Sequence, residues 1–271
     1  MNRSELITAI RHRRSCLCVG LDTDPDKVPV HLRDAEDPVF EFNRQIIDAT
    51  RDLCVAYKPN TAFYEATGAH GWETLRKTAS YIGNTHLRIA DAKRGDIGNT
   101  SERYAQAFFK QMDYDAITVA PYMGSDSVSP FLGFQGKWVI VLAHTSNPGS
   151  ADFQLFRSGE RALYEEVISK TRQWAGPDQL MFVVGATRAD RIQEIRAIAP
   201  ENFFLVPGIG AQGGSLEEVM ALGMNKDCGL LINASRSIIY AASGTDFADA
   251  ARAEALRMQQ IMDRYLTEAG L

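Results

Sequence analysis

The sequence offers few residues of the kinds that bind metals or cross-link a fold. Its 271 residues include four cysteines without a C-x-x-C pair and five histidines without H-x-x-x-H spacing. No zinc site, redox motif or other metal site is therefore indicated. All four cysteines fall in apolar runs, and we expect buried free thiols in a reducing cytosol. They are Cys16, Cys18, Cys54 and Cys228.

Excess positive charge and long apolar segments are also missing. The net charge of −5 gives no reason to expect nucleic acid or a membrane surface as a partner. No apolar run approaches the roughly 20 residues of a membrane helix. The first residues carry Glu5 and lack the apolar core of a signal peptide, and they are typical of a short amphipathic helix. These absences predict a cytoplasmic globular protein.

What the sequence does contain is a regular alternation of two kinds of segment. Eight apolar runs are nearly continuous in hydrophobic residues, which is typical of parallel strands covered on both faces. Segments with helical periodicity lie between most of them. The runs are 16–22, 54–60, 85–91, 116–122, 138–144, 180–187, 203–209 and 228–235. The helical segments are 40–52, 72–82, 100–112, 160–174, 188–199 and 215–222, with a short one at 125–134 and a last one at 247–269.

Eight strand–helix repeats in a chain of this length predict a single domain, residues 1–271, folded as a (β/α)8 TIM barrel. An open, doubly wound sheet is the alternative, because a count of strands does not show whether the sheet closes. Two irregular stretches, 23–38 and 146–159, follow predicted strands. Barrel enzymes build their sites at such strand ends, although plain surface loops are the other interpretation.

The third apolar run leads into the most informative residues, Asp91, Lys93 and Asp96. Because alternate residues of a strand point to one side, Asp91 and Lys93 are predicted to share a face, with Asp96 just past the strand end. Crowding charges in this way is costly unless they pair, and it often marks a reaction site. The alternative is a salt bridge that closes a strand end, since structural ion pairs also perturb titration.

Other predicted strands also end in polar or charged residues. Each one alone is as readily explained as a solvated charge or a strand-end pair. In a barrel, however, the strand ends meet at one mouth, so their coincidence indicates a site. The residues are Asp22, Lys58, Asn60, Ser146, Asn233, Ser235 and Arg236.

The seventh run continues through Gly208 and Gly210 to Gln212, formally a G-x-G-x-x-G match. The dinucleotide fingerprint follows a first strand and needs an acidic residue about 20 positions on, whereas the eighth strand here ends in Arg236. A phosphate site is the better interpretation, because glycines admit backbone N–H groups and barrels bind phosphate after strands seven and eight. Arg236 would add a bidentate clamp. A tight turn alone is the alternative.

Together these residues resemble the orotidine 5′-phosphate decarboxylase family, in its longer bacterial branch, over almost the whole chain. The strongest element is Asp91-x-Lys93-x-x-Asp96-Ile97-x-Asn99-Thr100, which fits the family's D-x-K-x-x-D-I-x-N-T signature. Supporting segments, in the family's order, are Gly20-Leu21-Asp22, Lys58, Thr145-Ser146-Asn147-Pro148-Gly149, Pro207-Gly208-Ile209-Gly210-x-Gln212-Gly213 and Ser235-Arg236-Ser237-Ile238.

The resemblance implies decarboxylation of orotidine 5′-phosphate to uridine 5′-phosphate in pyrimidine biosynthesis, without cofactor or metal. Lys93 would stabilise and protonate the C6 carbanion. It also implies a homodimer with shared active sites. The implied catalytic residues are Lys93, Asp91, Asp96 and Lys58, with Asp96, Ile97 and Thr100 reaching into the partner's site. The implied substrate contacts are Asp22 and Lys58 for the ribose, Ser146 for the pyrimidine, Gln212 and Arg236 for the phosphate, and Pro207, Gly208 and Gly210.

Two other functions fit part of the pattern. D-x-K-x-x-D is shared with related barrels that act on sugar phosphates. The first alternative function is therefore that of an aldolase or decarboxylase that acts on a pentulose or hexulose phosphate and uses Mg2+. Metal dependence separates it from the first interpretation. The other is a barrel that binds a phosphorylated ligand without turnover. Such a protein would not need the charged row at Asp91 and Lys93.

Overall fold

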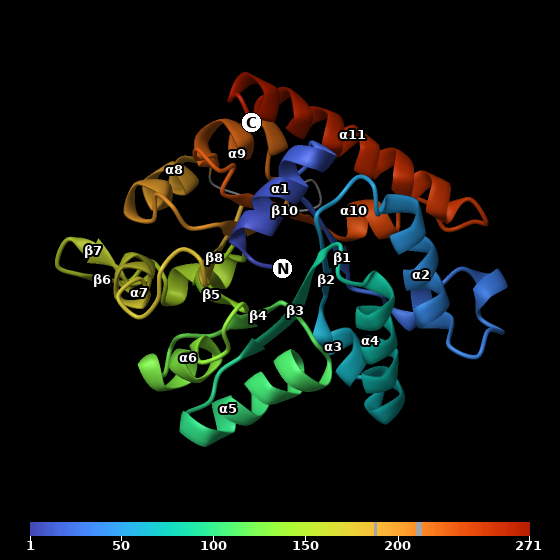
Figure 1. Ribbon diagram of the computed structural model, residues 1–271, viewed down its shortest axis with the longest axis horizontal. Coiled ribbons are helices and arrows are strands. Elements are labelled where there is room, and N and C mark those ends of the chain that lie inside the picture. Colours follow the sequence, from blue (N-terminus) through green and yellow to red (C-terminus); the bar gives the residue numbers. More distant parts are fainter. Residues whose placement is uncertain (187–188, 210–212) are drawn as a thin grey trace.

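The centre of the molecule is a closed barrel of parallel strands (Figure 1). The computed structural model describes residues 1–186, 189–209 and 213–271. Around the barrel the strands follow the chain, and the last one pairs back to the first. They are β1 (Leu17–Leu21), β2 (Ala56–Pro59), β3 (Leu87–Arg94), β4 (Ala116–Val119), β5 (Trp138–His144), β8 (Leu180–Val184), β9 (Phe204–Pro207) and β10 (Leu230–Ala234). The predicted (β/α)8 barrel is confirmed, and the open sheet is excluded.

Helices form a ring outside the barrel (Figure 1). Their apolar faces account for the helical periodicity: α2, for example, buries Phe42, Ile46 and Ile47 on one side. The ring consists of α2 (Pro38–Thr50), α4 (Gly68–Ile82), α5 (Gly98–Gln106), α6 (Ser125–Leu132), α7 (Leu163–Thr171), α8 (Ala189–Ile198), α9 (Leu216–Gly223) and α11 (Phe247–Glu268).

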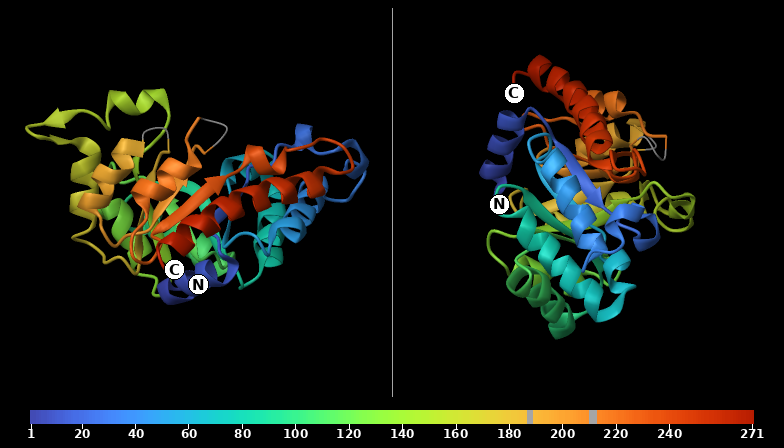
Figure 2. Two further views of the ribbon diagram at one scale, coloured as in Figure 1. Left: turned by 90° about the horizontal axis from the view of Figure 1, so that it is seen from above. Right: turned by 90° about the vertical axis from the view of Figure 1, so that its right-hand side faces the viewer.

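The two ends of the barrel differ. Helix α1 (Arg3–Arg13) covers the end where the strands begin, with Leu6 and Ile10 buried and a capping box of Asn2 and Glu5 at its start. Figure 2 shows α1 and both termini at this end and the arm formed by β6 and β7 at the other. The strands therefore end at an open mouth.

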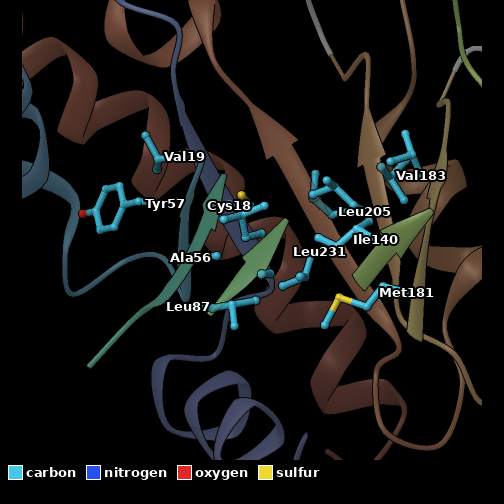
Figure 3. Close-up of a cluster of buried hydrophobic side chains, with 14 of the residues drawn as sticks. Cys18, Val19, Ala56, Tyr57, Leu87, Ile140, Met181, Val183, Leu205 and Leu231 are labelled. Carbon is cyan, nitrogen blue, oxygen red and sulfur yellow. The ribbon is translucent and has the colours of Figure 1, made fainter. Parts of the chain in front are cut away.

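The core fills the barrel and the space under its helices. Figure 3 shows part of it, with Leu205, Leu231, Ile140 and Met181 contributed by four different strands. All four side chains are at most 2% exposed. Strand residues pack alternately inside the barrel and beneath the helices. This double burial explains why the strands read as nearly continuous apolar runs.

Several boundaries differ from the predictions. Strand β3 does not stop at Asp91 but continues to Arg94. The helix predicted from residue 160 begins at Leu163, because β6 (Arg157–Ser158) and β7 (Arg161–Ala162) form a hairpin that turns at Gly159 with φ of 68°. Periodicity detects neither feature, since both depend on backbone turns.

Several short elements were not predicted. The helix expected at 100–112 is divided into α5 and a π-helix (Ala107–Gln111). The others are α3 (Thr61–Glu65), α10 (Arg236–Ile239) and the 3-10 turns Pro25–Lys27, Val30–Leu32 and Pro148–Asp152. Among the helices of the described residues, none has the length and hydropathy needed to cross a membrane.

Candidate active site

A row of alternating charges lies at the barrel mouth. Lys58 is near the end of β2, and Asp91 lies on β3, where it forms a bridge with Asn60. The two oxygens of the Asp91 carboxylate accept from different lysines: Oδ2 lies 2.7 Å from Nζ of Lys58 and Oδ1 lies 2.6 Å from Nζ of Lys93. Asp22, after β1, places Oδ1 4.0 Å from Lys58 Nζ. Strand ends far apart in sequence thus build one ion-pair network.

Lys93 is held in an unusual backbone conformation. Its φ is 46°, in the left-handed region, and the β3–β4 register shifts between Ala90 and Arg94. For a residue with a side chain this conformation costs about 1 to 3 kcal/mol, so the surroundings must enforce it. The simple alternation expected for a strand is therefore broken at Lys93. Its ammonium nevertheless reaches Asp91, and its side chain stays 50% exposed toward the mouth.

Thr118 of β4 supports both charged residues. Its hydroxyl donates to Asp91 Oδ1 over 3.0 Å and accepts from the backbone N–H of Lys93 over 2.9 Å. Thr118 is not among the site residues predicted from the sequence. The available signal was a hydroxyl among apolar residues of the fourth strand, which becomes informative only when that strand is known to lie beside β3.

The electrostatics keep Lys58 and Asp91 ionised. Burial by itself would lower the pKa of Lys58, but attraction to Asp91 and Asp22 outweighs it and raises that pKa above its ordinary value. Burial would likewise raise the pKa of Asp91, yet the charges of Lys58 and Lys93 hold it well below its usual range. The site therefore presents a buried ion pair of Lys58 and Asp91, and the second oxygen of the Asp91 carboxylate accepts from Lys93.

A cavity of about 140 Å³ adjoins the row. Asp22, Lys58 and Asp91 line it together with residues that follow β9 and β10. Those further residues are Pro207, Gly208, Ile209, Asn233, Ser235, Arg236 and Ser237. A larger cavity of about 310 Å³ beneath the loop 23–38 is lined mainly by apolar residues and includes no member of the charged row, so the smaller one is the candidate site.

The loop after β9 turns back on itself. Gly208 has φ of 101°, and its carbonyl accepts from Gly214 N–H over 3.2 Å. A Cβ on Gly214 would lie 2.6 Å from Cβ of Ala186, so this approach requires glycine. Pro207, Gly208 and Arg236, which the sequence predicted as substrate contacts, thus all line the cavity. Gly210 and Gln212 lie outside the described residues.

Other predicted site residues are not among the described residues that line this cavity. Ser146 follows β5 and is half-buried; its backbone packs so closely on Gly185 that a Cβ there would lie 2.7 Å from Ser146 N. Asp96 accepts from Ile97 N–H over 2.8 Å, and no ion pair joins its carboxylate to Lys93 within the described part of this chain. Ile97 is 53% exposed, and Thr100 is exposed on α5. Within the described part of one chain, Asp96 thus forms no ion pair with the row, and Ile97 and Thr100 remain exposed.

A closed parallel barrel with ion-paired lysines and aspartates at its mouth is the arrangement of a (β/α)8-barrel enzyme. Comparison with known proteins gives the family. The model of the orotidine 5′-phosphate decarboxylase / HUMPS family matches residues 15–252, and the chain belongs to this family.

Similar proteins cover the whole length. The chain is 56% identical to orotidine 5′-phosphate decarboxylase of Bacteroides fragilis over 271 residues, 98% of each chain. It is 56% identical to that of Flavobacterium johnsoniae over 265 residues, 97% of each. Among solved structures, OMP decarboxylase of Leishmania donovani is 38% identical with a TM-score of 0.82, covering 97% of this chain and 99% of that one.

Proposed function

We propose that this protein converts orotidine 5′-phosphate to uridine 5′-phosphate and CO2, a step of pyrimidine biosynthesis. The family and the full-length relatives carry that name. The observation that supports the chemistry is the Lys58–Asp91–Lys93 row, which places a partly exposed ammonium beside a buried carboxylate. A barrel that only bound a phosphorylated ligand would have no use for this costly arrangement.

Lys93 is the proposed acid. The bond between C6 and the carboxylate carbon breaks, CO2 leaves, and the electron pair stays on C6 in the ring plane. An ammonium opposite C6 stabilises that charge and then transfers a proton to it, which gives the C6–H of the product. Lys93 suits this task because it is exposed toward the mouth while Asp91 fixes its Nζ at 2.6 Å. No cofactor is needed as an electron sink.

Asp91 acts on the substrate as well as on Lys93. Held beside C6, its charge would face the substrate carboxylate. Two like charges about 4 Å apart repel by about 4 kcal/mol at an effective dielectric of 20. This repulsion falls as CO2 departs, whereas the attraction between Lys93 and the growing carbanion rises. Lys58 keeps Asp91 ionised throughout, which its 2.7 Å contact supports.

The rest of the nucleotide is placed by the cavity. We assign the ribose to Asp22 and Lys58 and the phosphate to Arg236 with Gln212. Pro207, Gly208 and Gly210 are assigned to the cavity wall, and Ser146 to the pyrimidine. The support for these assignments is that Asp22, Lys58, Gly208 and Arg236 line one cavity next to the row. Glycine at 208 leaves room for a ligand to approach the backbone.

We also propose a homodimer in which Asp96, Ile97 and Thr100 complete the partner's site. Asp96 has no lysine partner among the described residues of its own chain, and an apolar side chain at Ile97 is exposed. Tyr122 and Met123, on the loop after β4, are also exposed, at 87% and 47%. Apolar groups gathered after neighbouring strands fit a surface that a second copy covers.

The four free, buried cysteines support a cytoplasmic location.

The test is turnover by the Lys93→Ala variant, measured as loss of orotidine 5′-phosphate absorbance. We expect no measurable turnover but normal folding and uridine 5′-phosphate binding, because the lost interaction belongs to the transition state. A variant that kept a tenth of wild-type turnover would disprove the assignment.

EDTA provides the second arm of this test. Wild-type activity should survive it, since the described residues contain no cluster of three or more His, Cys, Asp or Glu that could hold a metal. Loss of activity that Mg2+ restores would instead favour the sugar-phosphate enzymes that share D-x-K-x-x-D.

A further inference from the structure

Asn233 is a buried amide with an unused acceptor. It lies near the end of β10, is 7% exposed and lines the cavity beside the charged row. Its Nδ2 donates to Ser235 Oγ over 3.4 Å, but its Oδ1 accepts no hydrogen bond within the described part of the chain. Leaving such an atom without a donor is unfavourable, and most buried polar atoms avoid it.

The neighbouring strand, β1, keeps space open around this amide. Gly20 of β1 faces Asn233 and Ser235: a Cβ on Gly20 would lie 3.3 Å from Asn233 Oδ1 and 1.8 Å from Ser235 Oγ. Any larger residue at position 20 would push these polar groups away. The absence of a side chain at Gly20 therefore allows the amide of Asn233 and the hydroxyl of Ser235 to occupy their positions in the cavity wall.

Strand order places Asn233 between the two ends of a nucleotide. Around the barrel the sequence is β2 with Lys58, β1 leading to Asp22, β10 with Asn233, and β9 leading to Gly208. On the proposed function, the base lies at the charged row and the phosphate at Gly208 and Arg236. The ribose links the two, so it is the part of the substrate that passes Asn233.

We propose that Asn233 determines specificity for the ribose, its Oδ1 accepting a hydrogen bond from one sugar hydroxyl. A hydroxyl carries one donor and so can satisfy this acceptor. Asp22 Oδ1 is a second buried acceptor without a hydrogen-bond donor in the described residues, 4.0 Å from Lys58 Nζ. Two open acceptors in one cavity match the two hydroxyls of a ribose. This inference rests on the proposed function and adds Asn233 to it.

The test compares substrates that differ by one hydroxyl. Asn233→Leu keeps the branching and the number of side-chain heavy atoms but removes the acceptor. Asn202→Leu is the control, because Asn202 is buried and donates to Leu180 O at the opposite end of the barrel. For orotidine 5′-phosphate, kcat/KM should fall about tenfold in the Asn233 variant, the effect of one hydrogen bond. For either the 2′-deoxy or the 3′-deoxy substrate the variant should match wild type, which identifies the hydroxyl. The control should lose the same factor for all three substrates.

If Asn233→Leu lowers kcat/KM equally for all three substrates, or not at all, the inference is wrong although the enzyme is a decarboxylase. If wild type does not turn over orotidine 5′-phosphate, the proposed function itself fails. The two failures are therefore distinguished within one experiment.

Thermal unfolding gives an independent readout. Removing an unsatisfied buried acceptor should leave the Tm of the unliganded protein equal or higher, because the folded state no longer carries its desolvation cost. The rise in Tm on adding uridine 5′-phosphate should become smaller than in wild type. An unchanged rise would mean that the nucleotide makes no contact with Asn233 and would overturn the inference.

Discussion

At the scale of single residues, the two lysines of the charged row differ in burial. Lys58 is 5% exposed and Lys93 is 50% exposed, although both donate to the same carboxylate. Solvent weakens an exposed ion pair, whereas a buried carboxylate that loses a partner keeps its desolvation cost. The first lysine is therefore suited to hold Asp91 in place, and the second is free to meet a substrate.

This difference in burial predicts that substitution of Lys58 mainly lowers stability, whereas substitution of Lys93 mainly abolishes catalysis. Lys58→Met should lower the free energy of unfolding by about 3 kcal/mol, as expected for breaking a buried pair. Lys93→Met should change it by less than about 1 kcal/mol while abolishing turnover. Urea unfolding at one protein concentration measures both, with the m-value as the check that the unfolding reaction is unchanged. Equal losses of stability would show that the lysines share one role.

At the scale of elements, Arg94 links three of them just after Lys93. Its guanidinium forms an ion pair with Glu65 at the end of α3 and stacks over Tyr104 and Phe108, which follow in α5 and the π-helix. Its carbonyl accepts from Ala120 N–H over 2.8 Å. These contacts fix the end of β3 and so help to enforce the left-handed backbone of Lys93.

Arg94→Met should therefore lower kcat about tenfold with little change in KM, because a misplaced Lys93 affects the transition state more than binding. Methionine keeps much of the stacked apolar stem, so the loss of stability should stay near 1 to 2 kcal/mol. Glu65→Gln, which retains a hydrogen-bond acceptor, is the matched control and should be milder. A normal kcat with reduced stability would make Arg94 a purely structural residue.

The helices and strands also show which structural features sequence periodicity predicts and which it does not. Periodicity located all eight strands and the main helices, because double burial and amphipathic faces leave a composition that can be read along the chain. It placed the end of β3 wrongly and missed the β6–β7 hairpin, because Lys93 and Gly159 adopt left-handed backbones. A lysine in a sequence does not indicate a left-handed backbone conformation.

At the scale of the whole molecule, the proposed dimer has a direct test by subunit mixing. Lys93→Ala and Asp96→Ala homodimers should each be nearly inactive. After exchange, half of the dimers are mixed, and each mixed dimer holds one intact site and one doubly altered site if the sites are shared. Activity should return to about a quarter of wild type per site. Full exchange without recovered activity would show that Asp96 acts within its own chain.

Stability in acid should depend on His86 at the start of β3. Its Nε2 donates to Arg51 O over 2.7 Å and its Nδ1 lies 3.0 Å from Thr85 Oγ1, where a neutral ring accepts. Burial lowers the pKa of His86 from 6.5 to about 4. The unfolded chain therefore binds more protons between these values, and stability falls as the pH drops through that range.

The expected loss between pH 7 and pH 4 is about 3 kcal/mol of unfolding free energy from this residue. His86→Gln should flatten the pH dependence over the same range, as measured by urea unfolding. His12→Gln, at an exposed position of α1, should not. An acid profile that is identical in all three proteins would exclude His86 as its source.

The sequence by itself determined the barrel class and pointed to the cluster of Asp91, Lys93 and Asp96. Eight doubly buried strands leave a local hydrophobic signal, and Asp91, Lys93 and Asp96 lie within six residues of one another. Only the tertiary structure determined which residues these side chains contact. Closure of the sheet brings Lys58 to Asp91, places Thr118 beneath both Asp91 and Lys93, and leaves Asn233 with an open acceptor beside Gly20. Those relations join residues that are 25 to 213 positions apart in the sequence, and contacts over such separations produce no periodic pattern along a chain.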